Sequence, residues 1–137
     1  APVVTTCGLL VNPAFPWLGA SPDRIVYDAV EKSYGIVEIK CPYSLRGLKA
    51  DELRAADFCS TIDNGTPHLK EDHAYYHQIV GQMGVSELSW GDFVVYGEDF
   101  ILIERIRFER SQWEKMKEVL DEFYFSTLLP YLSGVAL

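Results

Sequence analysis

The sequence predicts an α/β domain built on a mixed β-sheet. Three observations lead to this prediction. The first forty residues hold short apolar runs rich in β-branched residues, which are typical of strands. A helical period follows from residue 71, and two further strand patterns then precede a second helical pattern. Strands that alternate with helices in this way indicate an α/β fold.

The first part of the chain predicts three strands. They cover Val3–Val11, Trp17–Tyr27 and Gly35–Lys40. Ser21–Pro22 is expected to bend the second strand, and Tyr34–Gly35 is expected to form a tight turn before the third. A proline two residues after Lys40 cannot donate to a ladder, so the third strand should stop there.

The middle of the chain predicts one short helix and one firm helix. The short helix covers Asp51–Ala56, and Phe58–Lys70 should be irregular, with turn signals at Asn64–Gly65 and Thr66–Pro67. The firm helix covers Glu71–Ser86, with acids suited to its N-terminal dipole. Its apolar residues share one face: Tyr75, Tyr76, Ile79, Val80 and Met83.

The last part predicts a hairpin followed by a long helix. The strands are Trp90–Tyr96 and Phe100–Phe108, around a turn at Gly97–Asp99. A capping-box pattern at Ser111 starts the helix, and Pro130 should end it. One stripe of this helix is expected to be core: Trp113, Met116, Leu120 and Phe123.

Length and composition indicate one folded domain. With 137 residues, 48% hydrophobic and 13% aromatic, the chain can form a single core. The sequence has no run of eighteen apolar residues, so no membrane span is predicted, and no signal peptide is visible. Cys7, Cys41 and Cys59 lack a C-x-x-C pattern, which favours reduced thiols in the cytoplasm or nucleus. We expect Cys41 to be buried at a strand end.

The net charge of −8 is unusual for a protein that contacts phosphates. A net charge describes the average surface, however, and not a cleft. The basic residues form two groups in the sequence: Lys40, Arg46, Lys49 and Arg54, and then Arg105, Arg107, Arg110, Lys115 and Lys117. Each group is either a phosphate-binding surface or an ordinary solvated face.

Two acids and a lysine interrupt the apolar strands. Glu38 and Lys40 are two residues apart, so their side chains point to the same face of the third strand. They form either an ion pair at a strand edge or part of a ligand site. A hairpin would bring Asp23 beside Glu38, and two converging carboxylates repel unless a cation lies between them.

These residues resemble a known family. The segment from Trp17 to Asp23 reads W-x-G-A-S-P-D, and Glu38 begins E-I-K-C-P. This pattern is similar to lambda-exonuclease-like, YqaJ-type viral recombinase nucleases of the PD-(D/E)XK superfamily. The resemblance implies a central mixed sheet flanked by helices, as in restriction endonucleases. Many members have glycine after the first acid, where this chain has Arg24.

The resemblance also implies a catalytic site. Asp23, Glu38 and the carbonyl of Ile39 would hold Mg²⁺ or Mn²⁺, which prefer oxygen ligands. Lys40 would orient the attacking water or stabilise charge. A Y-x-x-Q pattern on the helix after residue 71 matches Gln78, which becomes the fourth catalytic candidate.

The expected activity is metal-dependent hydrolysis of DNA by a recombination-type exonuclease, acting on double-stranded DNA with a free end. Candidate substrate-binding residues are Ser21, Arg24, Arg46, Lys49 and Gln82. Family members usually carry a helical segment ahead of the first strand, and residues 1–137 are expected to be one nuclease-like domain without it. Either the chain is a fragment, or a partner chain or a homo-oligomer supplies that segment, or the activity is reduced. No membrane partner is expected.

Three interpretations stay open. The chain is either a nuclease, or a nuclease-derived module that binds nucleic acid or a protein without cutting, or a structural domain whose acids form surface pairs. His73 and His77 also have a spacing that suits a transition metal, although no H-E-x-x-H pattern surrounds them.

Overall fold

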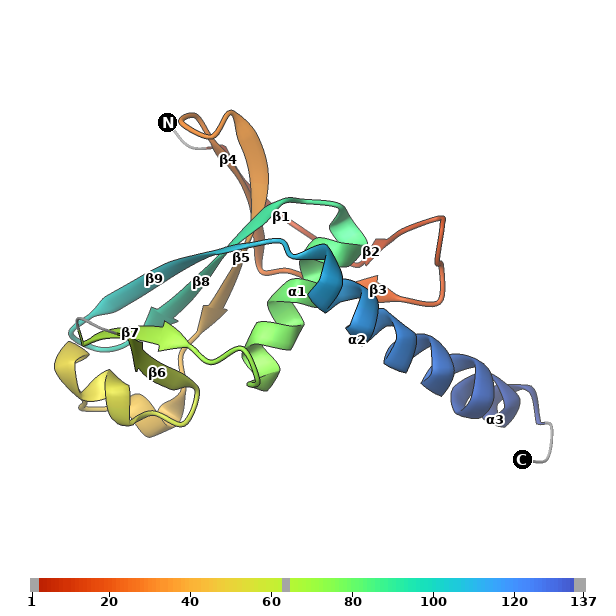
Figure 1. Cartoon of the computed structure of the whole chain (residues 1–137). Coiled ribbons are helices and arrows are strands. Elements are labelled where there is room, and N and C mark those ends of the chain that lie inside the picture. Colours follow the sequence, from red (N-terminus) through yellow and green to blue (C-terminus); the bar gives the residue numbers. More distant parts are fainter. Residues whose placement is uncertain (1–2, 63–64, 135–137) are drawn as a thin grey trace.

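The computed structural model describes residues 3–62 and 65–134 and contains a five-stranded mixed sheet (Figure 1). Its strand order is β1-β4-β5-β8-β9, in which β5 and β8 run parallel and the other pairs antiparallel. The sheet strands are β1 Val3–Thr6, β4 Arg24–Asp28, β5 Ser33–Lys40, β8 Trp90–Tyr96 and β9 Ile101–Arg107. The predicted α/β fold with a mixed sheet is confirmed.

Smaller elements surround this sheet. Two short ribbons are formed by β2 Leu10–Val11 with β3 Gly19–Ala20, and by β6 Cys59–Ile62 with β7 Thr66–Leu69. The helices are α1 Ala74–Ser86, α2 Arg110–Phe123 and α3 Leu129–Ser133. Tyr43–Leu45 and Ala50–Ala55 are 3₁₀ turns, and the π-helix Tyr124–Leu128 joins α2 to α3. In the described part of the chain, no helix is long and apolar enough to cross a membrane.

Helix α1 covers one face of the sheet. Ile79 and Met83 on α1 and Ile36 on β5 have no exposed surface, and Phe93 on β8 has 1%. Since side chains alternate along a strand, the residues between Ile36 and Lys40 divide between the two faces. Glu38 and Lys40 therefore share the α1 side with Ile36, and Ile39 lies on the opposite face with 41% of its surface exposed.

Helix α2 packs against α1 through a close contact at a glycine. A Cβ atom built on Gly84 would lie 2.3 Å from Cδ2 of Trp113, which is 7% exposed. The α2 helix then extends beyond the sheet, and α3 continues the same helical arm toward the C-terminus (Figure 1). The core prediction for this helix was therefore only partly right, because Leu120 and Phe123 are 37% and 54% exposed.

Two predicted boundaries near the N-terminus were wrong. The first predicted strand is broken, because β1 ends at Thr6 and Leu10–Val11 leaves the sheet to pair with β3. The predicted turn at Tyr34–Gly35 lies inside β5, and the chain instead reverses between Asp28 and Ser33. Gly35 is needed for packing, since a Cβ there would lie 2.2 Å from the Trp90 ring.

The segment that was predicted to be irregular forms the β6–β7 ribbon. Pro67 lies inside β7 and is not a turn. Of the predicted turn at Asn64–Gly65, Asn64 lies outside the described residues, and Gly65 has a φ of +76°, a conformation that favours glycine. The ribbon is fixed by Glu104 on β9, whose Oε2 accepts the Leu69 N–H at 2.7 Å.

Both predicted helix starts shift, and Pro130 does not end the last helix. Helix α1 begins at Ala74, because Nδ1 of His73 accepts the Tyr75 N–H at 3.1 Å as an N-cap. Helix α2 begins before Ser111, with no side-chain cap bond. The π-helix changes the backbone hydrogen-bond pattern just before Pro130. Pro130 therefore lies in the first turn of α3, where a backbone N–H would make no hydrogen bond within the helix.

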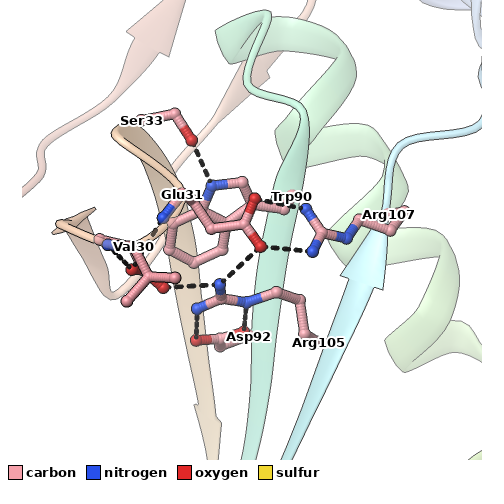
Figure 2. A network of polar contacts seen from close by, with 8 residues as sticks. Val30, Glu31, Ser33, Trp90, Asp92, Arg105 and Arg107 are labelled. Atoms are coloured by element: carbon pink, nitrogen blue, oxygen red, sulfur yellow. Dashed lines mark hydrogen bonds and ion pairs between the residues drawn. The ribbon is translucent and has the colours of Figure 1, made fainter.

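A charged network ties the β4–β5 turn to β9 on the face away from α1 (Figure 2). Arg105 donates to Asp92 through Nε at 2.8 Å and Nη2 at 2.9 Å, and to Asp28 through Nη1 at 2.7 Å. Its guanidinium lies 3.7 Å from the centre of the Trp90 ring, and Trp90 donates to Ser33 Oγ at 2.9 Å. The network fixes the hairpin that presents the acids of the candidate site.

These contacts change the acidity of the carboxyl groups involved. The side-chain hydrogen bond from Arg105 lowers the pKa of Asp28, with help from the backbone N–H groups of Glu31 and Val30. The hydrogen bonds from Arg107 likewise lower the pKa of Glu31. Both carboxylates are thus held in their charged form within the network.

Candidate active site

Asp23 and Glu38 are brought together by the antiparallel pairing of β4 with β5. Arg24 pairs with Val37, so Asp23, one residue earlier, lies across from Glu38. Oδ2 of Asp23 accepts the backbone N–H of Ile39 at 2.7 Å. Pro22 is fully buried just before Asp23 and turns the chain into β4. This is the neighbourhood that the hairpin argument predicts.

Glu38 receives a hydrogen bond from three side chains. Nζ of Lys40 and Nε2 of Gln78 each donate to Oε1 at 2.8 Å. Nε2 of Gln82 donates to Oε2 at 2.9 Å. Glu38 is only 5% exposed, so these charge-assisted bonds offset much of the cost of burying its carboxylate.

Lys40 is held by three electron-rich groups. Besides Oε1 of Glu38, its ammonium group donates to Oε1 of Gln78 at 2.7 Å. It also lies 4.8 Å from the centre of the Tyr75 ring, a distance typical of a cation–π contact. The predicted sharing of one face by Glu38 and Lys40 is confirmed.

The helical period of α1 places two glutamines and a tyrosine on the side that faces Glu38 and Lys40. Gln78 and Gln82 are four residues apart, and Tyr75 precedes Gln78 by three, so all three lie along one side of the helix. Tyr75 was predicted only as an apolar face residue. Its position one turn before Gln78 is the signal that would have found its contact with Lys40.

The predicted substrate-binding residues divide into two groups. Ser21 is exposed and lines a groove of about 520 Å³, together with Gln78 and Gln82. Arg24 is exposed beside the site and donates through Nη1 to the carbonyl of Asp23 at 2.6 Å.

The other two predicted residues follow Pro42 and lie between the two 3₁₀ turns. Arg46 pairs with Glu98 at 3.5 Å and approaches the Tyr43 ring at 5.9 Å. Lys49 begins the second turn, where its N–H donates to Oε2 of Glu52 at 2.7 Å. Their role in substrate binding stays a prediction. Cys41, which we expected to be buried, is exposed.

The oxygen donors near Glu38 are few. Among residues 3–62 and 65–134, no three His, Cys, Asp or Glu side chains are grouped closely enough to hold a metal ion. The cluster offers two carboxylates, which is the number that Mg²⁺ commonly takes from a protein when substrate phosphate completes its coordination. The donor set therefore fits a hard cation. His73 uses its Nδ1 as the helix cap, so it is not free to pair with His77 for zinc.

Two acids and a lysine lie at the ends of adjacent strands, on a mixed sheet covered by a helix. This is the restriction-endonuclease-like fold class that the sequence predicts. The family is shown by sequence. Residues 2–89 match the profile of the YqaJ-like viral recombinase domain, and the chain belongs to this family. No curated protein matches the chain.

Solved structures that share the fold include two of LHK-Exo. The crystal structure of LHK-Exo in complex with dAMP is 22% identical, with a TM-score of 0.65 over 97% of this chain and 63% of that one. The crystal structure of an alkaline exonuclease, LHK-Exo, from Laribacter hongkongensis is 23% identical, with a TM-score of 0.53 over 98% and 65%. The chain thus spans less than two thirds of the length of these relatives.

Proposed function

We propose that this domain is a metal-dependent nuclease that hydrolyses DNA, as a recombination-type exonuclease. The observation that carries the proposal is the position of Asp23 across from Glu38 and Lys40 on β5, with both carboxylates already oriented by donors. Membership of the YqaJ-like family supports the same activity.

Asp23, Glu38 and the carbonyl of Ile39 would hold Mg²⁺ or Mn²⁺. In a strand, the N–H and C=O of one residue point to the same side. Because the Ile39 N–H points to Asp23, its carbonyl faces the same side, beyond the end of β4. A cation bound there would lower the pKa of an attacking water and polarise the scissile phosphate.

The remaining side chains act by position and charge. Lys40 places a fixed positive charge beside Glu38, where it would stabilise the charge that develops on the phosphate. Gln78 donates to Glu38 and accepts from Lys40, so it holds the carboxylate and the ammonium group in one arrangement. Ser21 and Arg24 lie beside this cluster and would contact the DNA backbone.

The substrate that we propose is double-stranded DNA with a free end. A nuclease assay with Mg²⁺ or Mn²⁺ on linear and circular duplexes tests this directly. Asp23→Asn and Glu38→Gln should abolish cleavage, while Asp99→Asn, in the exposed β8–β9 turn, should leave it unchanged. Digestion confined to linear DNA supports an exonuclease. Full cleavage by either site variant refutes the metal site.

A second candidate is a nuclease-derived module that binds nucleic acid or a protein partner without cutting. It is favoured by the net charge of −8 and by the presence of only two acids in the described site. A homo-oligomer or a partner chain that adds a further acid would restore cutting. Binding to duplex DNA without cleavage, with no rise in melting temperature on adding Mn²⁺, would favour the module.

A further inference from the structure

Gln82 occupies an unusual position for a polar side chain. It is 3% exposed, on the buried side of α1, and its Nε2 donates to Oε2 of Glu38 at 2.9 Å. Its own carbonyl oxygen, Oε1, is buried and has no hydrogen-bond partner among the described residues. An unpartnered buried acceptor costs the folded state free energy, which the bond to Glu38 offsets. The contribution of Gln82 to stability is therefore small.

The hydrogen bonds to Glu38 also determine which lone pairs of its carboxylate oxygens are left to accept a further ligand. A carboxylate has about four lone-pair sites, two on each oxygen. Lys40 and Gln78 together occupy both sites on Oε1, and Gln82 occupies one on Oε2. One site on Oε2 is left for another ligand.

We infer that Gln82 is a positioning residue that fixes the Glu38 carboxylate in the orientation that would hold the divalent cation, with Oε2 as the oxygen that keeps a free site. The inference rests on the proposed function. The helix around Gln82 is rigid, since Ile79 and Met83 are fully buried, so the amide can hold this orientation before the cation arrives. Residues that orient a metal ligand in this way typically contribute 10- to 100-fold to metal affinity.

The test compares Gln82→Met, which keeps the size of the side chain but loses the amide, with Gln112→Met on α2 as the matched control. Gln112 is half-buried and does not line the groove that holds Gln78 and Gln82. Mn²⁺ affinity is measured by calorimetry and by the metal-induced rise in melting temperature. Melting without metal is the second measurement.

For Gln82→Met we expect roughly 10- to 100-fold weaker Mn²⁺ binding, with a metal-free melting temperature within about 3 °C of the wild type. The control should change neither quantity. Wild-type Mn²⁺ affinity in Gln82→Met would overturn the inference and leave the nuclease proposal intact. A large fall in metal-free melting temperature would overturn it by showing that Gln82 is structural. A wild type that neither binds Mn²⁺ nor cuts DNA would overturn both.

Discussion

The contact between Gly84 and Trp113 controls how α2 packs on α1. The structure gives the distances from which the free-energy cost of a methyl group at residue 84 can be estimated. A Cβ on residue 84 would lie 2.3 Å from Cδ2 and 2.5 Å from Cε2 and Cε3 of Trp113. The ring is 7% exposed and rigid, so Gly84→Ala should cost about 3 kcal/mol, at the upper end of overpacking. The gain in helix propensity returns about 1 kcal/mol. The net loss is about 2 kcal/mol.

Gly81, one turn earlier on α1, is the matched control. A Cβ there would lie 3.1 Å from Cε of Met116, the flexible end of a side chain that can move aside. Gly81→Ala should therefore gain up to about 1 kcal/mol. Thermal melting followed by circular dichroism should show Gly84→Ala lower by roughly 8 °C and Gly81→Ala higher by up to roughly 4 °C. Equal shifts in the two variants would refute the packing argument.

Two further predictions concern charge. The pKa values of Asp28 and Glu31 lie below their ordinary values of 3.8 and 4.5 because of their arginine hydrogen bonds. The stability that these ionised carboxylates give the folded state is thus fully present above pH 4.5 and is lost as the pH falls through their lowered pKa values. The urea unfolding midpoint should therefore fall less on acidification in Arg105→Gln than in the wild type. Tyr75→Leu removes the ring from Lys40 and should lower kcat/KM roughly 2- to 30-fold, with Tyr75→Phe as control. Unchanged kcat/KM in Tyr75→Leu would contradict a role for that ring.

The parts of the site that the sequence predicted are those set by short-range periodicity. Alternation along β5 placed Glu38 and Lys40 on one face, and the proline before Asp23 marked the bend that leads into β4. The four-residue spacing on α1 placed Gln78 and Gln82 together, while the family resemblance assigned Gln78 to the site. Each of these inferences needs only the geometry of a single element or hairpin.

The parts that were missed depend on contacts between distant segments. The β6–β7 ribbon is stabilised by Glu104, which bonds both the Leu69 N–H and the ring of His68 across more than thirty residues of sequence. No local pattern in Phe58–Lys70 predicts that this segment would contact Glu104. The π-helix before Pro130 is similar, since nothing in the local sequence predicted its change of register.

The fate of the basic residues explains how an acidic domain could act on DNA. In the group near the C-terminus, Arg105 and Arg107 are bound to Asp28, Glu31 and Asp92, so they neutralise the protein's own acids. These two arginines are therefore not free to bind phosphate. Attraction of DNA would then fall to a bound cation and to the exposed basic residues Arg24, Arg46 and Lys49. With so few basic contacts, binding should depend steeply on the divalent ion and only weakly on monovalent salt.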